Sequence, residues 1–313
     1  MNELTLQIKK KALELGFSAC GICRCEPFSE DTQLFFENWL KNGYQAKMNH
    51  LERNVSKRLN PKELVDFAQS VIVLTLNYYN PDYHKNKKSS YSFAQYALGA
   101  DYHSVIKEKL LRLADFISAQ AANSKQKIFV DSVPSFEKQL AQRAGLGKIG
   151  HNTLLLTEKG SYVFVGEVFT SLVLDYDKPL EKEICLHCNR CVNACPTKAL
   201  QSPYTLDTTA CIAYQTIENK EDISPFVREN MREYIYGCDF CQRACPLNAK
   251  AEKSSEKQFE PKKELLDFSN EQWETLTETD FQRIFQNSAV QRAGYEKLKR
   301  NIAIASLFSN SGQ

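Results

Sequence analysis

The sequence contains no long apolar run. Its first fifteen residues are rich in Lys and Glu and form no apolar signal core, and no stretch approaches the ~20 apolar residues of a membrane span. We therefore expect a cytosolic protein that has no membrane association and whose thiols stay reduced. A strong excess of charge of one sign is absent as well. The formal net charge of +2 neither requires nor excludes a nucleic-acid partner.

Cysteine, by contrast, is abundant and ordered. One run, Cys185-Leu-His-Cys188-Asn-Arg-Cys191-Val-Asn-Ala-Cys195-Pro, has the C-x2-C-x2-C-x3-C-P pattern of bacterial ferredoxins, in which the cysteine before proline binds the second of two 4Fe-4S clusters. A second run, Cys238-Asp-Phe-Cys241-Gln-Arg-Ala-Cys245-Pro, lacks the first cysteine of this pattern, and Cys211 is the only spare cysteine nearby. The predicted ligands are Cys185, Cys188, Cys191 and Cys245 for one cluster, and Cys211, Cys238, Cys241 and Cys195 for the other.

Structural zinc and disulfides fit these cysteines less well than iron–sulfur clusters do. Paired C-x2-C units can hold structural zinc, and eight cysteines in a secreted chain could form disulfides. Neither accounts for a proline directly after the last cysteine of both runs. Cys20, Cys23 and Cys25 supply only three thiols for a further metal, and we expect them to be small buried hydrophobes.

The length of 313 residues predicts about two domains, and the cysteine segment supplies only one of them. Mixed helix and strand patterns in the first 180 residues indicate a layered α/β or α+β domain. Apolar periodicity predicts helices over residues 4–15 and 105–120, and β-branched runs predict strands over residues 17–22, 70–76, 127–130, 161–170 and 171–174.

Two domains and a C-terminal region are predicted along the chain. Residues 1–178 form the larger body, residues 179–250 carry the clusters, and residues 251–313 form a linker and a C-terminal helical region. Residues 248–263 are dense in Lys, Glu, Ser and Gln, which predicts a surface excursion or linker. Helical periodicity returns after residue 264 and predicts a small helical cap.

Polar residues suited to chemistry occur in two places of the first domain. Asp131 directly follows the predicted strand 127–130, a common position for ligand-binding residues in layered α/β folds, although a turn-forming Asp is the simpler interpretation. Asp101 and His103 lead into the predicted helix 105–120, where they either contact a ligand or cap the helix.

A glycine-punctuated stretch over residues 142–153 follows. Its glycines would let the backbone approach a bulky ligand closely. The spacing of Gly145, Gly147 and Gly150 matches G-x-G-x-x-G but does not open a strand-turn-helix unit, so it does not predict a dinucleotide site.

Taken together, these motifs resemble the epoxyqueuosine reductase family, cobalamin- and iron–sulfur-dependent enzymes that complete queuosine in tRNA. The resemblance covers almost the whole chain. It is carried by the two cysteine runs and by Tyr96-Ala-Leu-Gly-Ala-Asp-Tyr-His103, Asp131, Gln142-Arg-Ala-Gly-Leu-Gly147, Asn152-Thr153, Cys211-Ile-Ala-Tyr-Gln-Thr-Ile-Glu218 and Tyr236-Gly-Cys-Asp-Phe-Cys-Gln242. It implies an α+β fold: a layered cobalamin-binding domain similar to reductive dehalogenase and nitroreductase-like folds, a ferredoxin-like double 4Fe-4S module and a small helical cap.

The resemblance also implies roles for individual residues. Asp131 would be the proton donor above the cobalt. The residues implied to hold cobalamin are Arg58, Asp131, Arg143, His151, Asn152, Thr153, Ile212 and Tyr214. The residues implied to contact substrate are Asp101, His103, Asn219 and Lys220.

The implied activity is the reduction of epoxyqueuosine to queuosine at the wobble position of tRNA, the final step of queuosine biosynthesis. The implied cofactors are cobalamin, cycling between cob(II)alamin and cob(I)alamin, and two 4Fe-4S clusters. An external low-potential donor of the flavodoxin or ferredoxin type would supply the electrons, and we expect a monomer. Some members carry a longer C-terminal helical-repeat region for tRNA, whereas this chain stops at Gln313, so we expect a tRNA contact that is smaller or arranged differently.

Three other functions share parts of this pattern. A reductive dehalogenase would use cobalamin and two clusters, but those enzymes usually carry an export signal. A plain two-cluster electron carrier would use residues 1–180 only to dock a partner. A zinc-bound nucleic-acid module would contain no iron, and iron analysis would therefore separate it from the others.

Overall fold

The computed structural model describes residues 2–309 of the chain. Its α-helices are α1 (Glu3–Glu14), α2 (Glu30–Lys41), α3 (Val55–Leu59), α4 (Pro61–Leu64), α5 (Tyr83–Asn86), α6 (Tyr102–Gln120), α7 (Glu137–Arg143), α8 (Arg190–Ala194), α9 (Ile212–Ile217), α10 (Pro225–Asn230), α11 (Phe240–Arg243), α12 (Lys263–Asp267), α13 (Asn270–Glu274), α14 (Glu278–Phe285) and α15 (Tyr295–Ser309). Its strands are β1 (Ala19–Arg24), β2 (Ser70–Asn77), β3 (Ser92–Phe93), β4 (Gln126–Phe129), β5 (Lys148–Ile149), β6 (Leu155–Leu156), β7 (Val163–Thr170), β8 (Leu200–Ser202), β9 (Thr205–Leu206) and β10 (Tyr234–Tyr236). Short 3₁₀ turns are η1 (Asn49–Leu51), η2 (Gln95–Ala97), η3 (Thr208–Ala210), η4 (Pro246–Lys250), η5 (Lys257–Phe259) and η6 (Ala289–Ala293).

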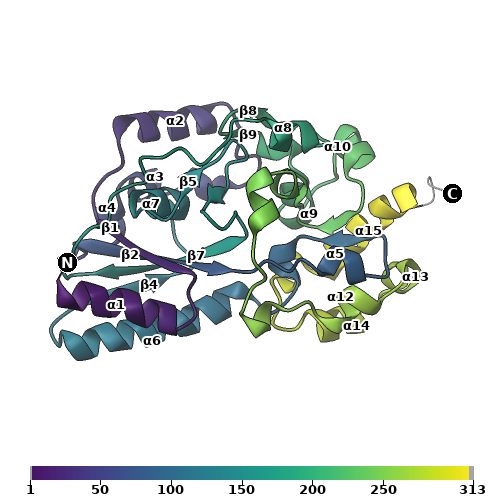
Figure 1. The fold of residues 1–313 in the computed structure, drawn as a ribbon. Helices are drawn as coiled ribbons and strands as arrows, with labels where there is room; N and C mark the ends of the chain where they lie inside the picture. The colour runs from purple at the N-terminus through teal and green to yellow at the C-terminus, as the bar shows by residue number, and fades with distance from the viewer. Residues whose placement is uncertain (1, 310–313) are drawn as a thin grey trace.

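A four-stranded sheet in the order β1-β2-β7-β4 forms the centre of the first domain, and every pair in it is antiparallel. Helices α1 and α6 cover one face, and α7 lies against the other (Figure 1). Strand β2 is buried on both faces because its side chains alternate between the two cores. Ile72 and Leu74 face α1 and α6, whereas Val71 and Val73 face α7.

The predicted helices and most predicted strands of this domain are present within a few residues of their expected bounds. The strand predicted over residues 171–174 is wrong. Thr170 is the last residue of β7. It pairs with Ser70 and with Gln126, which are the first residues of the antiparallel neighbours β2 and β4. Residues beyond Thr170 therefore have no strand to pair with, and the chain leaves the sheet.

Residues 248–263 form the surface excursion that was one of the two alternatives predicted for them, since most of them are exposed, but they are not a loose linker, because parts of the segment pack against α6 and the core beside it. Phe259 is 4% exposed and belongs to the same core as α1 and α6. The Lys109 ammonium lies 2.8 Å from a carboxylate oxygen of Glu256. Gly99 packs directly against the backbone of residues 258 and 259, where a Cβ would lie 2.3 Å from the carbonyl oxygen of Gln258. This segment is therefore polar in composition and is nevertheless fixed to the protein by packing and by an ion pair.

The C-terminal helices share a core with two earlier segments. Trp273, Phe281 and Phe285 pack with Phe93 of β3 and Tyr236 of β10. Strand β10 pairs in parallel with β3, so the cysteine-rich segment, the C-terminal helices and residues 83–98 meet in one place. In the described part of the chain, no helix combines the length and apolarity needed to cross a membrane.

Candidate active site

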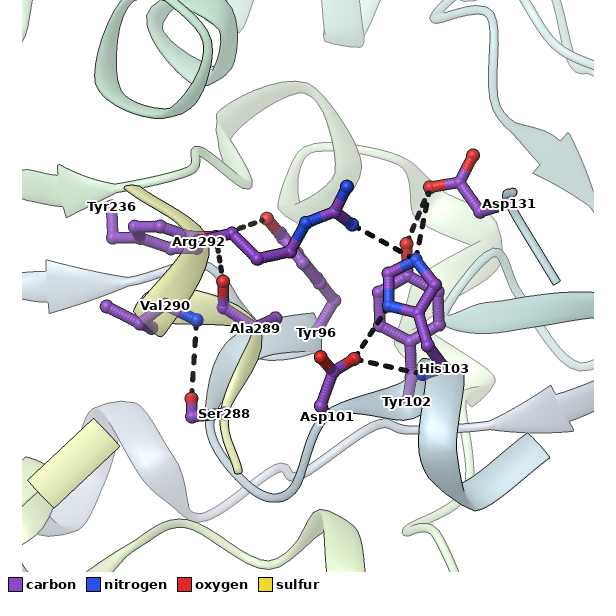
Figure 2. Close-up of polar contacts among 10 residues, drawn as sticks. All are labelled: Tyr96, Asp101, Tyr102, His103, Asp131, Tyr236, Ser288, Ala289, Val290 and Arg292. Atoms are coloured by element: carbon purple, nitrogen blue, oxygen red, sulfur yellow. Dashed lines mark hydrogen bonds and ion pairs between the residues drawn. The ribbon is translucent and has the colours of Figure 1, made fainter. Parts of the chain in front are cut away.

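Asp131 lies just after β4, at the edge of the sheet. Its backbone has φ +45°, a left-handed conformation that is uncommon outside glycine, and its side chain is 60% exposed. The Tyr102 hydroxyl donates a hydrogen bond of 2.6 Å to Asp131 Oδ2, and His103 Nε2 lies 3.9 Å from the same oxygen (Figure 2). Asp131 Oδ1 has no hydrogen-bond partner among residues 2–309, so it is open to a substrate.

The sheet topology does not place Asp131 at a ligand site, and the prediction is corrected on this point. Ligand sites at strand ends follow a rule for parallel sheets, in which the carboxyl ends of strands share one edge. This sheet is antiparallel. Asp131 faces a site because of its contacts with α6 instead.

Asp101 and His103 form the entrance of α6. Asp101 is the N-cap, and its carboxylate accepts hydrogen bonds from the backbone N–H of His103 at 3.0 Å and from His103 Nδ1 at 2.6 Å. Burial would raise the pKa of Asp101, but the hydrogen bonds from His103 outweigh it and hold that pKa below its usual value. The capping interpretation is confirmed, and the cap also orients His103 toward Asp131.

Arg292 reaches this group from η6, in the C-terminal region. Its guanidinium donates a hydrogen bond of 3.1 Å to His103 Nε2 (Figure 2). Because an arginine only donates, Nε2 must accept, and the ring proton is assigned to Nδ1, which faces Asp101. Arg292 is exposed, and its charge acts on the pKa of Tyr102, the residue that binds Asp131, so a fixed positive charge lies in the neighbourhood of the acid.

Two carboxyl groups lie on the inner side of the loop that carries Asp131. Glu137, at the start of α7, accepts a hydrogen bond of 2.7 Å from the backbone N–H of Asp131. Glu167, in the middle of β7, is fully buried and accepts a hydrogen bond of 2.9 Å from the Ser135 hydroxyl. Burial, and secondarily the neighbouring carboxylates, raise the pKa of both glutamates.

Replacing Glu167 by glutamine is expected to remove a pH-dependent loss of stability. A carboxyl with a raised pKa keeps its proton in the folded state at pH values where the unfolded chain has already lost it. The free energy of unfolding therefore falls as the pH rises above about 4.5, by at most about 1.4 kcal/mol per pH unit, until the raised pKa is reached. Glutamine cannot ionise, so the melting temperature of Glu167→Gln should fall less than that of the wild type between about pH 5 and 8. The exposed Glu14→Gln provides the control, and parallel curves for wild type and Glu167→Gln would contradict the prediction.

The cysteines of the two runs gather into two adjacent groups. Four of them line one small cavity together with His151 and Asn152, namely Cys185, Cys188, Cys191 and Cys245. The remaining four thiols, those of Cys195, Cys211, Cys238 and Cys241, lie close enough for their charges to act on one another. Burial and then the charges of Cys211 and Cys195 raise the pKa of Cys241, and burial and then the charge of Cys241 raise that of Cys238. The two groups have the membership predicted from the spacing, and their role as cluster ligands stays a prediction. Cys191 also lies near enough to Cys241 for its charge to raise the pKa of that thiol.

Cys20, Cys23 and Cys25 stay apart from both groups. Cys23 and Cys25 are buried in the apolar core between the sheet and α7. Burial raises the pKa of both thiols, to about 12 for Cys23 and to about 11 for Cys25. They behave as small hydrophobes, as expected.

Two of the predicted cobalamin-binding residues have buried nitrogen atoms without a partner. Arg58 Nε and Asn152 Nδ2 make no hydrogen bond within the described chain. Arg58 also lies close enough to Asp131 for the charge of that carboxylate to act on its pKa, which burial lowers. Unsatisfied buried donors are costly unless a bound group completes them. Each of these positions therefore fits a bound group that carries a hydrogen-bond acceptor, Arg58 near Asp131 and Asn152 beside the cavity of the first cysteine group.

Two further residues predicted to hold the cofactor are already engaged. Arg143 donates to the carbonyl oxygens of Glu26 at 2.7 Å and Pro27 at 3.0 Å, so it fastens the segment after β1. His151 is buried beside the first cysteine group, and its two ring nitrogens contact Asn189 and His187 at 3.0 and 2.9 Å. Cofactor contacts of Arg143 and His151 stay predictions, and these polar atoms already have partners inside the protein.

The glycines of residues 142–153 also serve internal packing. A Cβ at Gly147 would lie 2.3 Å from the carbonyl oxygen of Leu156, and one at Gly150 would lie 2.5 Å from the Leu156 side chain. The backbone approaches β6 here, which corrects the expected approach to a ligand. Thr153 has φ +63°, and its carbonyl oxygen accepts a hydrogen bond from Lys138 at 2.7 Å.

The segment after Cys211 packs inward. Ile212 and Tyr214 are buried in α9, and the Tyr214 hydroxyl accepts a hydrogen bond of 3.1 Å from the backbone of Lys47. Asn219 is 5% exposed, and its amide donates to Gln215 at 2.5 Å. This burial corrects the expectation that Asn219 approaches tRNA, whereas its neighbour Lys220 is exposed.

Sequence reasoning missed Tyr102, Arg292, Glu137 and Glu167. Tyr102 lies between the two residues that were predicted, and a hydroxyl beside an Asp and a His was a usable signal. Arg292 and the two glutamates carry no local signal. Arg292 contacts His103, Glu137 contacts Asp131 and Glu167 contacts Ser135 only through the packing of η6, α7 and β7 around α6 and β4.

The fold and the site together define a class: a redox protein in which an iron–sulfur segment is joined to an α+β domain that holds an exposed acid. Residues 184–248 match the model of the 4Fe-4S double cluster binding domain, which confirms the iron–sulfur prediction. Residues 58–132, which end one residue after Asp131, match the model described as Epoxyqueuosine reductase QueG, DUF1730. The chain belongs to the epoxyqueuosine reductase family, as the comparisons with individual members show.

Among curated relatives, the epoxyqueuosine reductase of Cellulophaga algicola is 42% identical over 296 residues, which cover 94% of this chain and 95% of that protein. The Escherichia coli enzyme is 36% identical over 311 residues, which cover 97% of this chain and 81% of that one. A crystal structure of epoxyqueuosine reductase with an epoxyqueuosine-modified tRNA-Tyr stem loop matches with a TM-score of 0.89 and 26% identity, covering 99% of this chain and 82% of that chain. The α+β fold is thereby confirmed.

Proposed function

We propose that this protein reduces epoxyqueuosine to queuosine at the anticodon wobble position of tRNA, using cobalamin and two 4Fe-4S clusters. Membership of the epoxyqueuosine reductase family over 94% of the chain carries this proposal. The arrangement of the site supports it. An exposed carboxyl with one free oxygen lies beside a phenol, an imidazole and a guanidinium, in a chain that also gathers two groups of cysteines.

The reaction needs two electrons and two protons, because the epoxide becomes an alkene and its oxygen leaves as water. Asp131 delivers a proton to that oxygen through its free Oδ1. Tyr102 holds Oδ2 at 2.6 Å and so keeps the acid in place. Arg292 supplies positive charge near the oxygen that becomes negative as the carbon–oxygen bond breaks.

Arg58 and Asn152 are the residues of this chain that would hold cobalamin, with the buried backbone around Ile212 and Tyr214 and the nearby Thr153 as further contacts. Bound cobalamin supplies a strongly reducing, nucleophilic cobalt. Lys220 is the exposed candidate for a tRNA contact, and Asp101 and His103 shape the pocket entrance for the base.

Electrons would enter at the first cysteine group. Cys188 is exposed, and its neighbour Leu186 is 62% exposed, so an external low-potential donor of the flavodoxin or ferredoxin type can approach there. They would leave through the second group, since Cys238 follows Tyr236 by two residues, and the Tyr236 hydroxyl lies 3.3 Å from that of Tyr96 within the site (Figure 2).

The proposal divides the chain by task. Residues 1–178 would bind cobalamin and carry the acid, and residues 179–250 would carry the clusters. Residues 251–313 would complete the site with Arg292. The protein is proposed to act as a monomer in the cytosol.

Mass spectrometry of tRNA tests the function directly. Purified protein with reconstituted clusters is incubated with epoxyqueuosine-containing tRNA and a low-potential reductant, with and without added cobalamin. We expect queuosine to form only when cobalamin is present. Conversion without cobalamin would refute the cofactor, and no conversion with clusters and corrin absorbance both intact would refute the substrate. A two-cluster electron carrier would bind no cobalamin at all.

A further inference from the structure

The loop of residues 131–136 lies between β4 and α7 and begins with Asp131. Tyr102 binds its Asp131 carboxyl, Val133 and Phe136 pack on the apolar core, and two further hydrogen bonds attach the loop to glutamates. At its start, the backbone N–H of Asp131 donates to Glu137 Oε1 at 2.7 Å. Near its end, the Ser135 hydroxyl donates to Glu167 Oε1 at 2.9 Å. Both acceptors are glutamates to which the proposed chemistry assigns no task.

Glu167 is an unusual residue for its position. It lies in the middle of β7, pairs with Val73 of β2 and Phe129 of β4, and is 0% exposed. Its second carboxyl oxygen, Oε2, has no hydrogen-bond partner in the described chain. An apolar side chain would fill this position at a lower cost, because a buried carboxyl with an unsatisfied oxygen is unfavourable. Its one polar contact is the bond to the Asp131 loop.

Asp131 itself needs such support. A residue other than glycine at φ +45° is strained and keeps that conformation only where surrounding contacts determine it. The bond to Glu137 satisfies the backbone N–H of this strained residue. Without it, the N–H would lose its partner and the residue could relax, moving the carboxyl away from Tyr102.

The charged groups around Glu137 and Glu167 do not indicate a second role for either glutamate. Arg58, Lys138 and Asp131 act electrostatically on Glu137, while Glu137, Asp131 and the Ser135 hydroxyl act on Glu167. No basic side chain of residues 2–309 forms an ion pair within 4 Å with either glutamate. Both carboxyls therefore serve as hydrogen-bond acceptors for the loop.

We propose that Glu137 and Glu167 are positioning residues that hold the loop of residues 131–136 and aim the Asp131 carboxyl at the reacting oxygen. The hold on the loop is a property of the fold. Its effect on the reaction rests on the proposed function.

Glu137 offers a matched pair of substitutions. Glu137→Gln keeps a side-chain oxygen that can accept from the Asp131 N–H, whereas Glu137→Leu keeps the size and removes the acceptor. The control is Glu158→Gln, an exposed glutamate in another loop. Hydrogen exchange measured by mass spectrometry on the cluster-loaded protein reports the loop without requiring activity. We expect exchange in residues 131–136 to rise at least about 10-fold in Glu137→Leu and to stay within about 2-fold of wild type in Glu137→Gln.

Turnover of epoxyqueuosine in tRNA provides the second measurement. Glu137→Leu should lower kcat at least about 10-fold with little change in KM, because substrate binding is intact while the acid is misplaced. Glu137→Gln should restore most of the rate. If Glu137→Gln lost as much rate as Glu137→Leu with a normally protected loop, the carboxyl would act as an acid and the positioning role would be overturned.

Ser135→Ala tests the second attachment and remains available if Glu137→Leu does not fold. It removes only the donor to Glu167, and we expect faster exchange in residues 131–136 and a lower kcat. Unchanged exchange in Ser135→Ala and in any folded Glu137→Leu would overturn the proposal. If exchange rises as expected but the wild type converts no epoxyqueuosine, the hold on the loop stands and the proposed function fails.

Discussion

Asp131→Asn is expected to lower the rate of epoxyqueuosine reduction about 10²- to 10⁴-fold, the range over which a positioned acid contributes to catalysis. Asparagine has the shape of aspartate, and its side-chain oxygen can still accept the hydrogen bond from Tyr102. It has no carboxyl proton to give to the oxygen that leaves. The fall should therefore lie in kcat, measured as the single-turnover conversion of modified tRNA by mass spectrometry.

Asp115→Asn is the matched control for this variant. Asp115 lies on α6, the same helix that supplies Tyr102 and His103, and is distant in sequence from the entrance of that helix. It should leave the rate unchanged. Iron content and corrin absorbance should be normal in both variants. Conversion by Asp131→Asn at the wild-type rate, with both cofactors bound, would show that another group donates the proton.

Cys211→Ser is expected to remove one cluster and to abolish turnover. Helices α9 and α10 separate Cys211 from Cys238 and Cys241 in the sequence, yet the charges of the thiols act on one another. Loss of one thiolate ligand should reduce the iron content from about eight to about four atoms per chain, the content of one 4Fe-4S cluster. Electron paramagnetic resonance of the reduced protein should then show one cluster in place of two interacting ones.

Cys20→Ser provides the control, because Cys20 is a free thiol in β1, outside both cysteine groups. Its iron content and turnover should match the wild type. Eight iron atoms and normal turnover in Cys211→Ser would mean that the second group takes its fourth ligand elsewhere. The assignment of Cys211 would then be wrong, while the first group would be unaffected.

Local patterns predicted the elements whose character depends on neighbours in the sequence. The apolar run of β2 predicted a strand buried on both faces, and the spacing of Ile106, Leu110, Leu113 and Ile117 predicted α6. What the patterns did not predict has one cause. Residues 171–174 look like a strand but have no partner, and the surface segment of residues 248–263 contributes Phe259 to the core beside α6, because pairing and packing depend on distant segments.

Arg143, His151 and Asn219 show the same limit within the site. Each is a polar residue in a motif that suggests ligand contact, and each is used by backbone or side-chain groups of the protein itself. Arg58 and Asn152 have the same polar character but keep a buried nitrogen free. The residue types do not distinguish the two cases, and only the neighbours do.

The cysteine spacing alone predicted the iron–sulfur chemistry, because seven of the eight predicted ligands lie in two short runs whose pattern is typical of 4Fe-4S clusters. The acid site could not be read in this way. Tyr102 and Asp131 are 29 residues apart, and His103 and Arg292 are 189 apart. Their contacts form only after β4, α6 and η6 have packed together, since hydrogen bonds between distant segments depend on the tertiary fold and not on any local pattern.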